Sequence, residues 1–478
     1  MTTQDCCAAG TLKSGRKYDL AVIGAGSAGF SAAITGAELG ANVALIGHGT
    51  VGGTCVNVGC VPSKTMIRAT ETLYQAEAAS RFAGIRADGR IIDWRAVVRQ
   101  KDELVSSLRQ AKYSDLLPAY NTIAYREGTA RLTPKGVVLD GEPIAARRVI
   151  IATGAAPALP AISGIETVPY LTSTSALELE QLPASLLVIG GGYIGCELGQ
   201  MFARAGVKVI IAARRRLLPE AEPEISDALA QYFTEEGLII RDGLTYRQIE
   251  QTPEGVALSV LIDGRAETMT AERVLVTSGR RPNTDGFGFR EAGIALLPNG
   301  GIEVDDRMRT SKIGVYAAGD VTGRDQFVYM AAYGARIAAE NALNGNSKRY
   351  DSSAMPAVVF TDPQVASVGL TESEARAQGI AVKTSTLKLS HVPRALAARD
   401  TRGLIKLVAE AKSGRILGAH IIAPEGGDSI QTAALAINVG LTVGQLAQTI
   451  FPYLTTVEGL KLAAQTFAKD VAKLSCCA

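Results

Sequence analysis

The sequence predicts an α/β protein with two Rossmann-like dinucleotide-binding domains and a C-terminal α+β domain. Three observations carry this prediction. The chain has 478 residues, more than one hydrophobic core usually serves. A glycine-rich fingerprint occurs twice, each time between an apolar strand-like run and a small-residue helix-like run. From about Ala354 the pattern changes to mixed strands and helices without such a motif.

The first fingerprint follows the apolar run 18–23 near the N-terminus. Its glycines are Gly24, Gly26 and Gly29. A helix is expected to continue to Leu39, and a second strand to cover 43–46. Glycines at this spacing let the backbone approach a pyrophosphate, which rests on the helix N-terminus.

The second fingerprint lies about 166 residues later, after the run 186–189. Its glycines are Gly190, Gly192 and Gly195. A helix is expected to Ala205, followed by a strand over 207–211. The alternative is that both are glycine turns in ordinary βα loops, but two copies with the right flanks favour two nucleotide domains.

Composition excludes several classes of function. The net charge of +2 provides no broad basic surface for nucleic acid or an anionic membrane. The first residues contain no apolar core of signal-peptide length, and no run of about 18 apolar residues occurs. We therefore expect a cytoplasmic protein with no membrane insertion and no nucleic-acid partner.

The pair Cys55 and Cys60 follows the turn Gly52–Gly53 at the start of a predicted helix. Thiolates are stabilised at helix N-termini. Two thiols five residues apart across such a turn can also form a strained, reducible disulfide. We expect a redox-active pair; the alternative is two buried structural cysteines. Lys64 could add positive charge nearby, with Glu197 as its candidate partner.

The adjacent pair Cys476 and Cys477 lies one residue before the chain ends. Neighbouring cysteines form a disulfide only with strain, so two thiolates binding a soft ion linearly fit better. The alternative is a cloning scar or an oxidation-prone tail. Cys6 and Cys7 could act as a minimal metal relay or be incidental, and Cys196 is expected in the core.

The second strand of each nucleotide unit normally ends in an acid that binds a ribose. Gly47 stands near that place in the first unit, so the acid is missing there, and His48 or backbone groups could replace it. In the second unit Ala213 stands near the place and 214–216 are all arginine. Arginine pairs with a 2′-phosphate, so we expect NADPH rather than NADH. The alternative is a solvated basic turn.

Three segments resemble one known family. They are Gly52–Lys64, Met355–Val365, and Phe451–Lys461 followed by Leu474–Cys477. They are similar to the flavoprotein disulfide reductases, and within these to the mercuric reductases, over about residues 17–477. The resemblance implies a homodimer that uses FAD and NADPH and reduces Hg²⁺ supplied as thiol complexes. It also implies that the partner's tail delivers the ion to the inner cysteine pair.

The fingerprints and the resemblance together name the expected site residues. Cofactor contacts are expected at Gly24, Gly26, Gly29, Gly53, Thr54, Lys64, Thr153, Gly154, Asp320, Gly190, Gly192, Gly195, Arg214, Arg215 and Gly279. The chemistry is expected at Cys55, Cys60, Cys476, Cys477, Tyr193, Tyr453, Lys64 and Glu197, with the four cysteines as the metal ligands. By resemblance, Cys60 faces the flavin, Cys55 is the interchange thiol and Asp320 binds the ribityl chain.

Histidine is scarce, and its placement separates the candidate reactions. Members that reduce organic disulfides carry a His-Pro pair near Tyr453 and a glutamate near Glu458, whereas this chain has Tyr453-Leu454. Releasing an organic thiolate needs a general acid, but reducing Hg²⁺ to Hg⁰ does not. The remaining alternatives are a dihydrolipoamide or glutathione reductase-like enzyme and a flavoprotein that sequesters metal without turnover.

The expected domain order follows from these assignments. It is a disordered leader over 1–16, an FAD-binding domain over 17–165, an NADPH-binding domain over 166–284, a central FAD-binding part over 285–353, and a dimerisation domain with the cysteine tail over 354–478.

Overall fold

The computed structural model describes residues 17–474, which form two compact units. Unit 1 contains residues 17–57, 104–156 and 280–350, and unit 2 contains 58–103, 157–279 and 351–474. The predicted leader and the pair Cys476–Cys477 lie outside the described residues.

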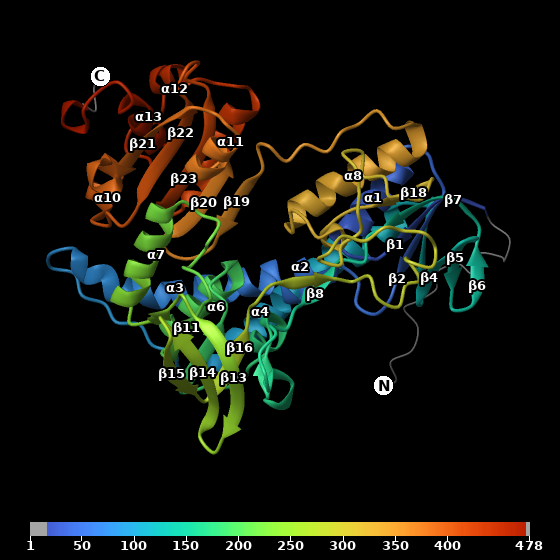
Figure 1. Cartoon of the computed structure of the whole chain (residues 1–478), viewed down its shortest axis with the longest axis horizontal. Helices are drawn as coiled ribbons and strands as arrows, with labels where there is room; N and C mark the ends of the chain where they lie inside the picture. Colours follow the sequence, from blue (N-terminus) through green and yellow to red (C-terminus); the bar gives the residue numbers. More distant parts are fainter. Residues whose placement is uncertain (1–16, 475–478) are drawn as a thin grey trace. The chain divides into compact units, whose positions relative to one another are not determined.

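A parallel five-stranded sheet forms the centre of unit 1, in the order β18-β7-β1-β2-β3 (Figure 1). Its strands are β1 (Tyr18–Ile23), β2 (Val43–Gly47), β3 (Ile123–Glu127), β7 (Ala146–Ile151) and β18 (Val315–Ala317). β2 is buried along its whole length, which explains its unbroken apolar sequence. The helices α1 (Ser27–Glu38) and α8 (Val328–Asn344) pack side by side.

Smaller elements complete unit 1. An antiparallel sheet contains β4 (Ala130–Thr133), β5 (Gly136–Leu139) and β6 (Glu142–Ile144). A short ribbon pairs β8 (Ala155–Pro157) with β17 (Arg280–Pro282). The helix α2 (Gly53–Val58) lies where the chain leaves unit 1, and α4 (Trp94–Arg109) lies where it returns.

Unit 2 contains a second parallel sheet, in the order β12-β11-β10-β16-β9. Its strands are β9 (Tyr170–Leu171), β10 (Ser185–Ile189), β11 (Lys208–Ala212), β12 (Ile239–Arg241) and β16 (Arg273–Val276). An antiparallel sheet contains β13 (Thr245–Thr252), β14 (Gly255–Ile262) and β15 (Arg265–Ala271). The associated helices are α3 (Cys60–Glu77), α5 (Ser173–Ala176), α6 (Tyr193–Arg204) and α7 (Pro223–Glu235).

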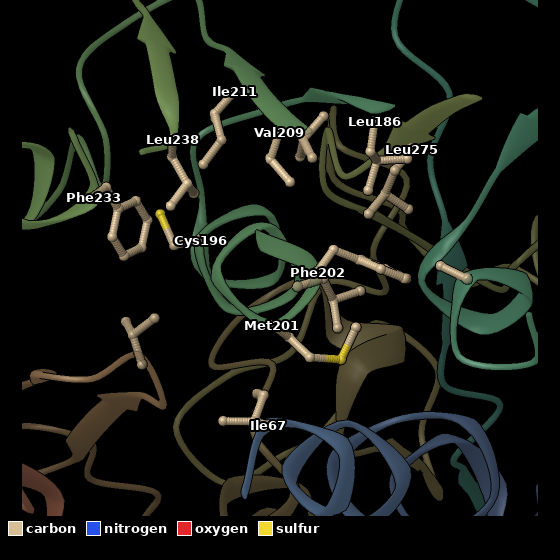
Figure 2. Close-up of a cluster of buried hydrophobic side chains, with 14 of the residues drawn as sticks. Ile67, Leu186, Cys196, Met201, Phe202, Val209, Ile211, Phe233, Leu238 and Leu275 are labelled. Carbon is tan, nitrogen blue, oxygen red and sulfur yellow. The ribbon is translucent and has the colours of Figure 1, made fainter. Parts of the chain in front are cut away.

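The core beside this sheet is built around α6 (Figure 2). Cys196, Met201 and Phe202 of α6 pack with Val209 and Ile211 of β11, and all five are almost completely buried. Ile67 of α3 belongs to the same cluster. Cys196 was predicted from the sequence to be a core residue, and its side chain is fully buried.

The C-terminal part of unit 2 is an antiparallel sheet in the order β19-β20-β23-β22-β21. Its strands are β19 (Pro356–Val359), β20 (Gln364–Gly369), β21 (Val382–Lys388), β22 (Leu404–Glu410) and β23 (Ile416–Ala423). Its helices are α9 (Glu372–Ala377), α10 (Pro393–Ala398), α11 (Gly426–Asn438), α12 (Val443–Gln448) and α13 (Glu458–Gln465).

Two parallel sheets joined by helices, and an antiparallel sheet with helices, confirm the predicted fold class. The predicted domain boundaries stay a prediction. None of the described helices is both long and apolar enough to cross a membrane.

Candidate active site

The first glycine loop joins β1 to α1 and leaves no room for side chains. A Cβ at Gly24, where φ is +118°, would lie 2.2 Å from the carbonyl oxygen of Ala152. A Cβ at Gly29 would lie 1.7 Å from the carbonyl oxygen of Gly24. Gly26 caps α1 without a side-chain acceptor, so the first N–H groups of the helix can receive an anion. The loop fits a dinucleotide pyrophosphate.

The second glycine loop repeats this geometry between β10 and α6. A Cβ at Gly190 would lie 2.6 Å from the carbonyl oxygen of Thr277, and one at Gly195 would lie 2.0 Å from that of Gly190. The space beside Gly192, which caps α6, contains no atom within 4 Å of an added Cβ. This loop also fits a pyrophosphate.

The three arginines after β11 have different surroundings. Arg215 forms an exposed ion pair with Glu220, with 2.8 Å between Nη2 and Oε1. Arg216 donates to the carbonyl oxygen of Ala221 at 2.6 Å and therefore shapes the turn itself. Arg214 has no hydrogen bond or ion pair with any residue in the range 17–474. Arg214 is thus the arginine most available to a phosphate.

The cysteine loop begins at the glycine loop of unit 1. The backbone N–H of Gly52 donates to the carbonyl oxygen of Ala25 at 2.8 Å. The Asn57 side chain donates to the carbonyl oxygens of Val51 and Gly53 at 2.8 and 2.9 Å. The Gly52 bond ties the segment before α2 to the predicted pyrophosphate site, and the Asn57 bonds hold the turn itself.

Cys55 and Cys60 occupy the starts of two successive helices. Cys55 is the third residue of α2, and Cys60 is the first residue of α3. Both side chains are half-buried. The N-terminal end of α3 has no side-chain cap, and the unsatisfied N–H groups there favour a thiolate.

Lys64 and Glu197 form an ion pair in unit 2, with 2.7 Å between Nζ and Oε2. The Glu197 side chain is only 6% exposed and also accepts the N–H of Phe360 at 2.9 Å. The Lys64 ammonium lies 4.8 Å from the centroid of the Phe360 ring. Because Lys64 follows Cys60 by four residues, its positive charge lies one turn along the same face of α3.

Asp320 is held by Arg280, which the sequence analysis did not assign. The Arg280 Nε lies 3.6 Å from the Asp320 carboxylate, and its Nη2 donates to Thr54 Oγ1 at 3.3 Å. Burial raises the pKa of Asp320, and the charge of Arg280 opposes that rise. Arg280 therefore connects the predicted flavin-binding acid to the residue before Cys55.

Thr153 and Gly154 lie directly after β7. The Thr153 hydroxyl donates to the carbonyl oxygen of Asn283 at 2.7 Å, and the Asn283 amide returns a bond to that of Thr153 at 2.9 Å. In unit 2 the carbonyl oxygen of Gly279 accepts the N–H of Ala158 at 3.0 Å. These residues close the turns where the sequence predicted cofactor contacts.

Tyr193 and Cys196 both lie on α6 but have different environments. Tyr193 is the first helical residue and is 37% exposed. Burial raises the pKa of Tyr193, and the charges of Glu197 and Glu220 raise it further, so the phenol stays neutral. The Cys196 thiol donates to the carbonyl oxygen of Gly191 at 3.5 Å, and burial raises its pKa. Cys196 therefore remains an unreactive thiol.

The segment before α13 contains Tyr453 and Glu458. Tyr453 is 54% exposed, whereas Glu458 is buried. Leu454 has a φ of +62°, and its N–H donates to the Glu458 carboxylate at 3.2 Å. The Glu458 carboxylate thus accepts a backbone N–H. In family members that act on organic disulfides, the corresponding glutamate is expected to pair with a histidine.

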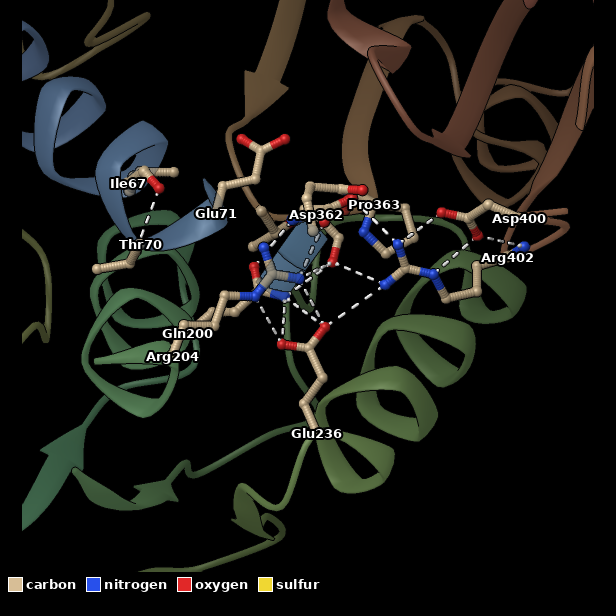
Figure 3. Close-up of polar contacts among 12 residues, drawn as sticks. Ile67, Thr70, Glu71, Gln200, Arg204, Glu236, Asp362, Pro363, Asp400 and Arg402 are labelled. Atoms are coloured by element: carbon tan, nitrogen blue, oxygen red, sulfur yellow. Dashed lines mark hydrogen bonds and ion pairs between the residues drawn. The ribbon is translucent and has the colours of Figure 1, made fainter. Parts of the chain in front are cut away.

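A buried network of charges supports α3 within unit 2 (Figure 3). The Tyr74 ring of α3 lies 4.0 Å from the Arg204 guanidinium and 4.9 Å from that of Arg402. Arg204 binds Glu236 at 2.7 Å and Asp362 at 3.0 Å, and Arg402 binds Asp362 at 3.3 Å. Removing one member of such a buried set typically costs about 3–5 kcal/mol of stability. The network fastens the helix that begins at Cys60.

The predicted residues are distributed over both units. Unit 1 holds Gly24, Gly26, Gly29, Gly53, Thr54, Cys55, Thr153, Gly154 and Asp320. Unit 2 holds Cys60, Lys64, Gly190, Tyr193, Gly192, Gly195, Glu197, Arg214, Arg215, Gly279 and Tyr453. Across 17–474, no three His, Cys, Asp or Glu side chains are grouped to hold a metal ion. Cys476 and Cys477 lie outside the described residues.

Two family models match the chain. Residues 18–339 match the pyridine nucleotide-disulphide oxidoreductase model, and 355–464 match the dimerisation domain of the same group. Mercuric reductase of Lysinibacillus sphaericus is 47% identical over 462 residues, covering 96% of this chain and 84% of the relative. Mercuric reductase of Streptomyces lividans is 47% identical over 96% of this chain and 98% of its own length.

Solved structures with the same fold include two bacterial proteins. The flavoprotein disulfide reductase RclA of Escherichia coli, as a Cu(II) complex, has a TM-score of 0.82 at 30% identity. That match covers 95% of this chain and all of RclA. LpdA of Mycobacterium tuberculosis has a TM-score of 0.81 at 27% identity over 94% of this chain and 99% of its own.

Proposed function

Because the chain belongs to the pyridine nucleotide-disulphide oxidoreductases, and within them to the mercuric reductases, we propose that it reduces Hg(II) to Hg(0) with electrons from NADPH. The observation that carries the proposal is the pair of cysteines at the starts of α2 and α3, next to a dinucleotide loop. The overall reaction is NADPH + Hg²⁺ → NADP⁺ + H⁺ + Hg⁰. Its cofactors are FAD and NADPH, and FAD held at the first glycine loop would supply the two-electron chemistry between the nicotinamide and the cysteines.

The chain's residues divide the work of binding and charge control. The α3 N-terminus and the Lys64 ammonium favour the Cys60 thiolate that a soft ion binds. Glu197 holds Lys64 in place through the 2.7 Å pair and is itself held by the Phe360 N–H. Two thiolates match the linear coordination expected for Hg²⁺.

The surroundings of Glu458 favour a metal substrate over an organic disulfide. A leaving thiolate would need a proton, and a histidine supplies it in the usual arrangement. The chain has three histidines, and His420 is buried in β23 with Nε2 3.1 Å from the Leu370 carbonyl oxygen. His48 and His391 lie in segments remote in sequence from Glu458. Reduction of Hg²⁺ consumes electrons without that proton.

The delivery route in this proposal uses the C-terminal tail of a homodimer. Residues 355–464 match a dimerisation domain, which supports two copies. Cys476 and Cys477 would take Hg(II) from thiol complexes and transfer it to the Cys55–Cys60 pair of the partner subunit. Each transfer replaces one mercury–sulfur bond by another, so little free energy is lost at a step.

Substrate choice is the direct test of the proposal. With Hg²⁺ in excess thiol, the holoenzyme is expected to oxidise NADPH and release volatile Hg⁰. With glutathione disulfide or lipoamide as the acceptor, it is expected to oxidise little NADPH. Rates at 340 nm with each substrate, and mercury vapour trapped from the same reactions, provide the measurement. Faster turnover of either organic disulfide would favour a disulfide reductase, and tight Hg²⁺ binding without vapour would favour sequestration.

The basic turn leads to a prediction about nucleotide choice. Arg214→Ala is expected to weaken NADPH binding by about ten- to a hundredfold, because a charge-assisted contact is worth roughly 1.5–3 kcal/mol. NADH binding should change little. Arg215→Ala should have a smaller effect, since Glu220 already neutralises that side chain. Nucleotide fluorescence titrations measure the Kd values.

The matched control removes an exposed arginine of the same unit at Arg265 on β15. Arg265→Ala should leave both Kd values unchanged. If Arg214→Ala weakens NADPH and NADH equally, the arginine does not bind the 2′-phosphate.

A further inference from the structure

The end of β2 lacks the acid that normally binds the adenosine ribose. Gly47 is the last residue of β2 and lies 18 residues after Gly29, close to the usual spacing of about 20 from the fingerprint. A glycine loop that fits a dinucleotide pyrophosphate is nevertheless built beside it. Any side chain that binds the ribose at this edge therefore comes from another position.

Gly47 is a glycine because of space and not because of its backbone conformation. Its φ is not positive. A Cβ at this position would lie 2.8 Å from the hydroxyl oxygen of Tyr125 and 2.7 Å from the Cβ of Ala25. The Tyr125 hydroxyl therefore occupies the space into which an acidic side chain would extend.

The strand register explains how Tyr125 reaches this place. β2 and β3 are parallel, with Leu45 opposite Tyr125 and Gly47 opposite Glu127. Tyr125 thus starts two residues, about 6.6 Å, before the level of Gly47. Its ring extends along the sheet face, and its hydroxyl ends beside the last residue of β2.

The Tyr125 hydroxyl is available for a ligand. It makes no hydrogen bond to another residue of the described range 17–474, and its side chain is half-buried. Burial raises the pKa of Tyr125, and the charge of Glu127 adds to the rise, so the hydroxyl stays neutral. His48, which directly follows β2, and Glu127, which ends β3, are both exposed.

We propose that the Tyr125 hydroxyl replaces the missing acid and hydrogen-bonds the adenosine ribose of FAD. The inference rests on FAD as the flavin of the proposed function, but not on mercury as its substrate. A carboxylate has two oxygens and can accept a bond from each ribose hydroxyl, whereas the phenol has one oxygen with a single O–H to donate. The chain should therefore distinguish FAD analogues by one ribose hydroxyl only.

The test measures flavin binding to apoprotein, without NADPH or mercury. FAD and its analogues lacking the 2′- or the 3′-hydroxyl of the adenosine ribose are titrated by flavin fluorescence. The wild-type chain should bind one of the two analogues about three- to tenfold more weakly than FAD, the range for one neutral hydrogen bond. Tyr125→Phe should bind FAD more weakly by the same factor and should no longer distinguish that analogue.

Glu127→Gln and His48→Asn are the matched controls, and both should keep the wild-type discrimination. The proposal is overturned if the wild-type chain binds both analogues as tightly as FAD, and this measurement requires no variant. It is also overturned if Tyr125→Phe keeps the discrimination, or if either control removes it. An enzyme that binds FAD as described but does not reduce Hg²⁺ would refute the proposed function and leave this inference standing.

Discussion

Cys55→Ala and Cys60→Ala are each expected to reduce Hg(II)-dependent NADPH oxidation to background while FAD stays bound. The flavin loop is built from Gly24, Gly26 and Gly29, so losing either thiol leaves it intact. Cys55→Ala should keep a long-wavelength absorbance from a Cys60 thiolate next to the flavin, because the α3 N-terminus and Lys64 still favour that thiolate. Steady-state rates and visible spectra of the two holoenzymes provide the measurement.

Cys196→Ala is the matched control for the loss of one thiol. The Cys196 side chain lies in the core of unit 2 and takes no part in the proposed chemistry. Its variant should keep full turnover and the same spectrum, at some expense of thermal stability. If the long-wavelength band survives in Cys60→Ala and disappears in Cys55→Ala, the roles of the two cysteines are reversed.

Activity is expected to return when two inactive chains are combined in one dimer. A Cys55→Ala/Cys60→Ala chain lacks the inner pair, and a Cys476→Ala/Cys477→Ala chain lacks the tail pair. Each alone should be poorly active with thiol-bound Hg²⁺. If the tail of one subunit serves the inner pair of its partner, the mixed dimer has one complete site and should recover about half of the wild-type rate per dimer.

Subunit exchange needs an independent check in this experiment. Two different affinity tags, purified in sequence, isolate the mixed dimer before the assay. A Cys196→Ala chain combined with the tail variant gives the reference for a dimer with both inner pairs present. A purified mixed dimer without activity would show that the tail acts within its own chain or has no role in delivery.

The fold could be predicted because its signals are local in sequence. Both parallel sheets follow from short apolar strands, such as β1 and β10, that end directly in a glycine fingerprint. Helix ends were predicted to within one residue, since α1 ends at Glu38 and α6 at Arg204. The likeness to mercuric reductases, which the cysteine motifs indicated, agrees with relatives 47% identical over 96% of the chain.

The groups that the sequence analysis missed are all brought to the site from distant segments. Arg280 meets Asp320 and Thr54 although 226 residues separate it from Thr54. Phe360 meets Glu197 across 163 residues through its backbone N–H, which no side-chain pattern encodes. Tyr125 fills the space beside Gly47 only because β3 pairs with β2 in one particular register. Such contacts depend on the topology of the fold, and no local sequence motif predicts them.

The charge network around Tyr74 is buried, so ionic strength should affect it much less than the exposed basic turn after β11. Mobile ions screen exposed pairs strongly and buried pairs weakly. Arg204, Glu236 and Asp362 have side chains at most 9% exposed, whereas Arg214, the arginine available to a phosphate, is exposed. Concentrated salt should therefore leave α3 and its Cys60 in place while it weakens the attraction between the basic turn and a phosphorylated nucleotide. At high salt concentration, NADPH binding would therefore weaken before the position of Cys60 changes.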